Sequence, residues 1–214
     1  MVSLVVSLTP WSRFILYPFK LFTTWVHECG HALMTLLVGG RVMTITIEPN
    51  GSGLTQSLVP VGRVARGLVA SSGYLGAAAV GCLLIAASRI QKWAPAILLG
   101  LGAFMLFTLA FWMRNPFGAW VVLAWGVALV TLARQGRGDA SRFFLSLLGI
   151  QVALNSVYDI RVLFQIDRGP SDAATMEGLF LLPSWMWAAA WMVASLAMLG
   201  ATLRLTRGLR LRRG

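Results

Sequence analysis

The chain has 214 residues, of which 57% are hydrophobic and only 12% are charged. Soluble domains average about 45–50% apolar and about 25% charged residues, so this composition excludes an ordinary soluble domain and favours a membrane protein. The net charge of +11 would suggest a nucleic-acid ligand in a soluble protein. We predict no nucleic-acid partner here, because the arginines lie between and after the apolar runs, where they face the membrane surface.

Six apolar stretches approach the length of about 20 residues that a membrane-spanning helix needs. They lie at about 14–38, 64–87, 93–113, 117–133, 143–164 and 183–203. The first contains Lys20 and a polar cluster, and the second is rich in glycine and alanine, which allow helices to pack closely. We therefore predict an all-α integral membrane protein, with residues 1–214 forming a single membrane-embedded domain of about six transmembrane helices.

The segment between the first two spans has a different pattern. Gly39 and Gly40 can end a helix, and the following RVMTITIEP alternates with a period near two. A turn of sequence PNGSG leads into LTQSL, which together predict a short β-hairpin at about 41–58. Because exposed strand edges are not tolerated in lipid, we expect the hairpin at the membrane interface or in a cavity lined by helices.

Arginine and lysine also predict the orientation. With six spans, the two termini lie on the same side of the membrane as the second-to-third and fourth-to-fifth loops. These segments carry more arginine and lysine than the opposite side, which places both termini on the cytoplasmic side of what we expect to be a bacterial inner membrane. The basic C-terminal tail is predicted to contact anionic lipids. Its arginines are Arg204, Arg207, Arg210, Arg212 and Arg213.

The first span contains the sequence HECGH at residues 27–31. His27 and His31 are four residues apart, so both imidazoles lie on one helix face and can bind the same metal ion. Glu28 directly follows the first histidine, as it does in peptidases where such a glutamate takes a proton from zinc-bound water. These polar side chains are costly inside a membrane, which favours a Zn²⁺ site over chance placement.

A hydrolytic zinc needs a third protein ligand and an open position. The chain has no third histidine, so we expect a carboxylate, and Asp159 is the first candidate. Gln151, Asn155 and Asp159 are spaced by four on an apolar helix, and such a stripe is expected to face the bundle interior. Asn155 is predicted to orient the substrate backbone or to hold Asp159. The second candidate ligand is Asp172, although Asp172 or the neighbouring Ser171 could instead cap a helix.

Several stretches resemble the site-2 protease family of intramembrane zinc metallopeptidases, especially its small bacterial branch without appended domains. They are HECGHALMTLLVGGRV, SGLT, SSGYLGAAAVG, NSVYDI and SDAATMEG. The resemblance implies substrates that span or are anchored in the membrane, a zinc held by both histidines and an aspartate matching Asp159, and a β-structured loop that pairs with the substrate. Asp159 is followed by Ile160, however, where better-known members have glycine.

The predicted function is thus an intramembrane zinc metalloendopeptidase, in which Glu28 activates zinc-bound water for attack on a membrane protein substrate. The alternative is a non-catalytic zinc-binding scaffold or a transporter. A transporter needs a polar pathway through several spans, and the third, fourth and sixth spans carry almost no ionisable residues.

Overall fold

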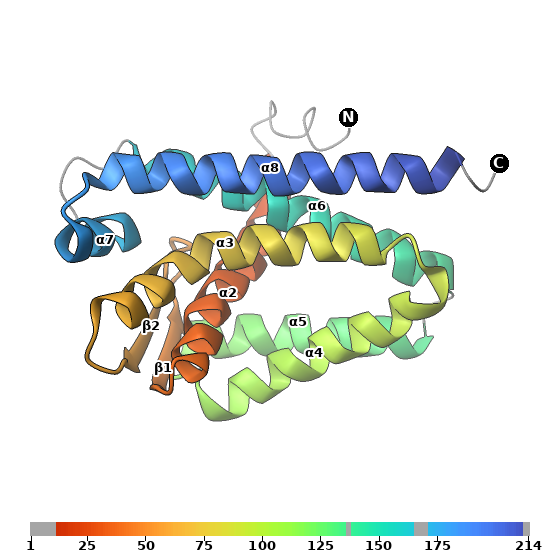
Figure 1. The fold of residues 1–214 in the computed structure, drawn as a ribbon. Helices are drawn as coiled ribbons and strands as arrows, with labels where there is room; N and C mark the ends of the chain where they lie inside the picture. The colour runs from red at the N-terminus through yellow and green to blue at the C-terminus, as the bar shows by residue number, and fades with distance from the viewer. Residues whose placement is uncertain (1–11, 136–137, 165–170, 212–214) are drawn as a thin grey trace.

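The computed structural model describes residues 12–135, 138–164 and 171–211 (Figure 1). Its elements in chain order are α2 (Ser12–Leu37), β1 (Arg41–Ile47), β2 (Gly53–Leu58), α3 (Arg63–Ala87), the 3-10 helix η1 (Gln91–Trp93), α4 (Ala94–Phe111), α5 (Pro116–Gln135), α6 (Gly138–Leu163), α7 (Asp172–Phe180) and α8 (Ser184–Leu211). The predicted helical fold, with a β-hairpin between its first two long helices, is confirmed.

Within the described part of the chain, five helices are long and apolar enough to cross a membrane. They are α3, η1 with α4, α5, α6 and α8, at bounds close to the predicted spans. The first predicted span corresponds to α2, which is not among the five because Lys20 and the HECGH cluster interrupt its apolar surface. The short α7 is an additional helix in a segment for which the sequence predicted a loop or a helix start.

Helix α3 lies at the centre of one half of the molecule and packs against α2, α6, α7 and α8 (Figure 1). Its small residues permit this, as the sequence predicted. A methyl group added to Gly81 would lie 2.7 Å from the backbone nitrogen of Ala153 in α6, and one added to Gly30 in α2 would clash with the carbonyl oxygen of Ser72 in α3. Backbone therefore meets backbone at both crossings, as in other membrane helices with small interfacial residues.

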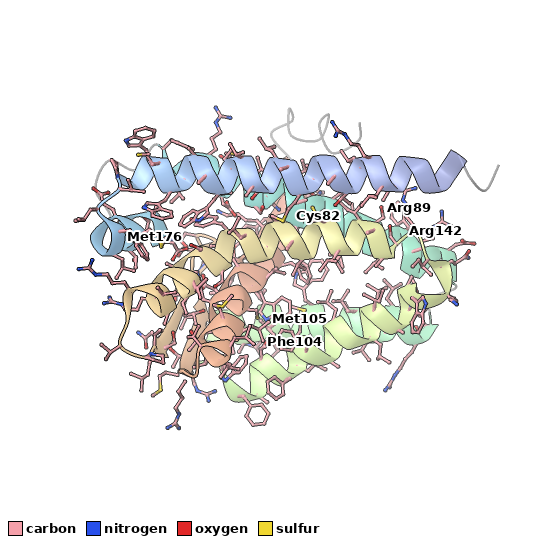
Figure 2. The ribbon with its side chains drawn as sticks, viewed as in Figure 1. Cys82, Arg89, Phe104, Met105, Arg142 and Met176 are labelled. Carbon is pink, nitrogen blue, oxygen red and sulfur yellow. The ribbon has the colours of Figure 1, made fainter. Side chains whose placement is uncertain are left out.

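Two hydrophobic clusters hold the elements together. The larger one joins α2 and the hairpin to α4, α5 and α6, with Phe22, Trp25 and Met105 fully buried. The smaller one joins α7 to α3, α6 and α8, and Met176 of α7 packs into it (Figure 2). Its buried members are Ala70, Ile160, Ala173, Met176, Ala188 and Trp191. This second cluster fixes the position of α7, and hence of the first residue of that helix.

The hairpin has one covered edge and one open edge. Strand β1 pairs antiparallel with β2. On its other side β1 meets the segment that links α4 to α5, where the Ile45 N–H donates to the carbonyl oxygen of Trp112 over 2.7 Å and the Asn115 side chain bonds both backbone groups of Ile47. Strand β2 lies against α2 and pairs with no strand besides β1 in the described chain.

Candidate active site

Two helices bring three possible metal ligands together. His27 and His31 lie one turn apart on α2, and their Nε2 atoms are separated by 3.0 Å. The Asp172 Oδ2 atom lies 3.3 Å from each of these nitrogens. Asp172 is the first residue of α7, far along the chain from α2. Among the described residues these three form a group whose ligand atoms all lie within 4.8 Å of one another.

This arrangement fits zinc. Ligands at 2.0–2.1 Å from a tetrahedral zinc lie about 3.3 Å from each other, close to the separations found here. Two imidazole nitrogens and one carboxylate oxygen are also the ligand types of many catalytic zinc sites, which leave the fourth position open. Gly73 of α3 adds a steric argument, because a Cβ atom there would lie 2.5 Å from the Nε2 atoms of both histidines. A glycine at this point keeps the space beside the ligand atoms free.

Helix α3 also orients His31. The His31 Nδ1 atom lies 2.7 Å from the carbonyl oxygen of Val69, which can only accept a hydrogen bond. Nδ1 therefore carries a proton, and Nε2 faces Asp172, where it can hydrogen-bond the carboxylate or, once it has lost its own proton, bind a metal ion through its lone pair. Hydrogen bonds of this type fix the tautomer and the ring orientation of metal-binding histidines.

The local structure of α7 leaves Asp172 free to be a ligand. Ser171 is the N-cap, since its Oγ accepts a hydrogen bond from the Ala174 N–H over 3.1 Å. The Asp172 carboxylate does not cap the helix, and it lies beside both histidine side chains. Burial by itself raises the pKa of this carboxyl, but hydrogen bonds to His27 and His31 outweigh burial and hold the pKa well below its usual range. Asp172 is therefore a carboxylate at neutral pH, as a metal ligand must be.

Glu28 lies beside the ligands and is held by the hairpin. Its side chain is buried, and its Oε2 accepts a hydrogen bond from the Thr55 hydroxyl over 2.7 Å. Strand β2 reaches the carboxylate because it has Gly53, where an added Cβ atom would lie 2.5 Å from Glu28 Oε1. Glu28 is not a member of the three-ligand group. It thus lies beside the possible ligands without being one of them, with one carboxylate oxygen held by Thr55.

The carboxylate that the structure brings to the histidines is that of Asp172, the second candidate, and not that of Asp159, while the identity of the third zinc ligand stays a prediction. Asp159 lies on α6 within electrostatic range of His27 and Lys20, so its helix face does turn toward the site, but it is not in the ligand group. The Asn155 amide donates a hydrogen bond to the Thr23 hydroxyl over 3.3 Å and so links α6 to α2. Substrate binding by Asn155 stays a prediction.

A cavity of about 470 Å³ gives access to these groups. The three ligands and Glu28 all contribute to its lining, and β2 and α3 supply much of the rest. Tyr74 and Arg66 of α3 and Leu54 of β2 are further lining residues. The open edge of β2, the Glu28 carboxylate and the ligand triad, which consists of His27, His31 and Asp172, therefore border the same cavity.

Three residues of the site were not singled out from the sequence. Gly73, Tyr74 and Thr55 all fall within stretches that carry the family resemblance, SSGYLG and SGLT. Glycine, tyrosine and threonine are common in the helices and strands of such proteins, so no local sequence signal distinguishes these three residues. Their roles depend on which elements pack against α2, and that is decided by the tertiary structure.

The fold and the site define a multi-pass membrane protein with a metallopeptidase-like cluster. A family model described as Peptidase M50B-like matches residues 1–202, nearly the whole chain. The chain therefore belongs to the Peptidase M50B-like family, within the site-2 proteases, and the resemblance predicted from the sequence is confirmed. No curated protein and no solved structure matches the chain.

Proposed function

We propose that this protein is a zinc-dependent intramembrane endopeptidase that cuts membrane-spanning or membrane-anchored proteins. The observation that carries the proposal is that His27, His31 and Asp172 converge while the buried Glu28 lines the same cavity. A carboxylate beside a zinc site can serve as the base that takes a proton from water activated by the metal.

The mechanism assigns a role to each group. His27, His31 and Asp172 would hold the zinc, which would supply Lewis-acid chemistry that lowers the pKa of water and polarises a carbonyl. Glu28 accepts the proton from the attacking water and later gives it to the leaving amine. The Thr55 hydroxyl holds Glu28 Oε2 in place, and Glu28 lines the same cavity as the three possible ligands.

The open edge of β2 supports a mode of substrate binding. Peptidases act on extended chains, and a strand can pair with the free edge of another strand through backbone hydrogen bonds. Gly53, Leu54 and Thr55 of β2 line the cavity beside Glu28, whereas the edge of β1 is already occupied. We propose that an unwound stretch of substrate pairs with β2 and so brings its peptide bond next to the ligand triad.

The positive charge supports a proposed orientation and partner. We keep both termini on the cytoplasmic side of a bacterial inner membrane, with anionic lipids at the basic end of α8. Of the tail arginines, Arg212 and Arg213 lie outside the described residues. A single cysteine placed after residue 214 in a variant lacking Cys29 and Cys82 should react with a membrane-impermeant maleimide only after the cytoplasmic face is opened.

The test of the proposed function separates metal from base. Purified wild-type protein should contain one zinc per chain and cleave a quenched-fluorophore peptide that has a membrane-spanning segment. Glu28→Gln should keep the zinc and lose cleavage, and His27→Ala should lose both. Glu48→Gln, at the exposed hairpin turn, is the matched control and should behave as wild type. A wild-type protein without zinc, or a Glu28→Gln variant that cleaves normally, contradicts the proposal; zinc without cleavage would indicate the non-catalytic scaffold.

A further inference from the structure

The aromatic ring of Tyr74 is clamped beside the ligand triad. It meets the His27 ring edge to face at a centroid distance of 4.6 Å, and it stacks on Trp191 of α8 at 5.3 Å with an interplanar angle of 22°. Trp191 belongs to the buried cluster that also holds α7. A ring fixed between two neighbours in this way holds its hydroxyl in one place, which is the condition for preorganised catalysis.

The Tyr74 hydroxyl is uncommitted, unlike the other hydroxyls that line the cavity. The Thr55 hydroxyl donates to Glu28, and the Thr175 hydroxyl donates to the Ser171 carbonyl oxygen. The Ser171 Oγ is engaged as the helix cap. In the described chain, Tyr74 has ring contacts but its hydroxyl has no hydrogen-bond partner, although the residue is half-buried and lines the cavity.

Such a donor would assist peptide hydrolysis at this site, in addition to the polarisation that a bound zinc would supply. When water attacks, negative charge develops on the carbonyl oxygen of the peptide bond, and a fixed hydrogen-bond donor that meets this charge lowers the barrier. A carboxylate cannot do this because it only accepts hydrogen bonds, whereas a phenol donates one. Arg66 also lines the cavity, but its side chain is long and exposed, so holding it in one geometry costs more conformational entropy.

We propose that Tyr74 is a catalytic residue whose hydroxyl donates a hydrogen bond to the carbonyl oxygen of the scissile peptide bond as that oxygen gains charge. This rests on the proposed function. Tyr74→Phe keeps the ring and its contacts with His27 and Trp191 and removes only the hydroxyl. Tyr158→Phe is the matched control, since Tyr158 is 60% exposed on α6.

The experiment has three readouts on the full-length protein. Zinc content should stay at the wild-type level in Tyr74→Phe. The kcat for the quenched membrane-spanning peptide should fall by about 10²–10³-fold, as for loss of one oxyanion donor, with KM nearly unchanged. The affinity for a phosphinic peptide, which carries charged oxygens where the reacting carbonyl would be, should weaken, while that for the matching uncleaved peptide amide should not. Tyr158→Phe should leave all three unchanged.

Each outcome decides the point. Wild-type kcat and wild-type phosphinate affinity in Tyr74→Phe overturn the inference, and so does loss of zinc, which would show a structural role for the hydroxyl. If the wild-type protein cleaves nothing, the proposed function fails, and the phosphinate affinity still decides whether Tyr74 donates to a charged oxygen.

Discussion

Two pairs of apolar helices in this protein are used in different ways. Helix α3 packs against α2 through small residues, and about half of its apolar membrane-length stretch is buried inside the protein. Helices α4 and α5 pack mainly against each other, and the corresponding buried shares are only 28% for η1 with α4 and 22% for α5. In Figure 1 the α4–α5 pair diverges from α3 and leaves α2 between them.

The comparison shows that apolar composition alone does not separate a site helix from a supporting helix. The α2–α3 pair combines close backbone approach with polar side chains, and β2 and α7 also line the resulting cavity. The α4–α5 pair contributes a buried apolar surface and the segment that covers the β1 edge. We infer that α4 and α5 support the site region without taking part in its chemistry.

The largest effect is expected from replacing the aspartate that α7 brings to the two histidines. Asp172→Ala should abolish stoichiometric zinc binding, because two histidines then remain for a metal that needs three protein ligands. Asp159→Ala is the matched change on α6 and should keep one zinc per chain, with at most the roughly 10–100-fold loss of affinity seen when an outer partner is removed. Zinc titration of both purified variants measures this. The opposite result would restore Asp159 as the ligand.

The next test compares a glycine of the α2–α3 pair with a glycine of the α4–α5 pair. Gly73→Ala in α3 places a methyl group 2.5 Å from the ligand nitrogens of both histidines, so zinc content and cleavage should both fall strongly. Gly100→Ala in α4 has no atom within 4 Å and should raise the melting temperature slightly, since alanine is favoured in a helix by up to about 1 kcal/mol. Equal zinc content in the two variants would mean that α3 does not form the wall of the site.

A smaller effect is expected from the hydroxyl that holds the base. Thr55→Val removes the hydrogen bond to Glu28 and keeps the shape of the side chain, so the cleavage rate should fall about 10-fold, as for a charged hydrogen bond worth about 1.5 kcal/mol. Zinc content should not change. Thr44→Val on β1, whose hydroxyl bonds Gln56 at the exposed face, is the control. Similar rates for both variants would leave Thr55 without a role in positioning Glu28.

The smallest functional effect is expected at the contact between the two regions. The Trp25 indole N–H donates to the buried Thr108 hydroxyl of α4 over 2.9 Å. Thr108→Val leaves that N–H unpaired and should lower the free energy of unfolding by about 1–3 kcal/mol. Cleavage by the folded protein should be unaffected, and Thr131→Val on the exposed face of α5 should change neither. A large loss of activity in folded Thr108→Val protein would show that α4 does more than support the site.

Local pattern was sufficient for the helices, for the hairpin and for half of the site. Apolar runs of helical length and the alternation in 41–58 depend only on neighbouring residues. The same holds for His27, Glu28 and His31, since the helical repeat alone puts both imidazoles on one face. The polar stripe ending at Asp159 was also correctly expected to face inward.

The candidate for the third ligand depended on the tertiary structure. Asp159 and Asp172 both lie on elements that pack near the site, and no spacing in the sequence encodes which of the two carboxylates lies beside the histidines. The cluster around Met176 and Trp191 decides it by fixing the first turn of α7 beside the histidines. Gly73, Thr55 and Tyr74 likewise acquired their roles from packing. The sequence by itself determined that His27, Glu28 and His31 lie together on one helix, while only the tertiary structure decided which carboxylate lies beside the histidines, because a metal site requires atoms from distant segments to meet within one small volume.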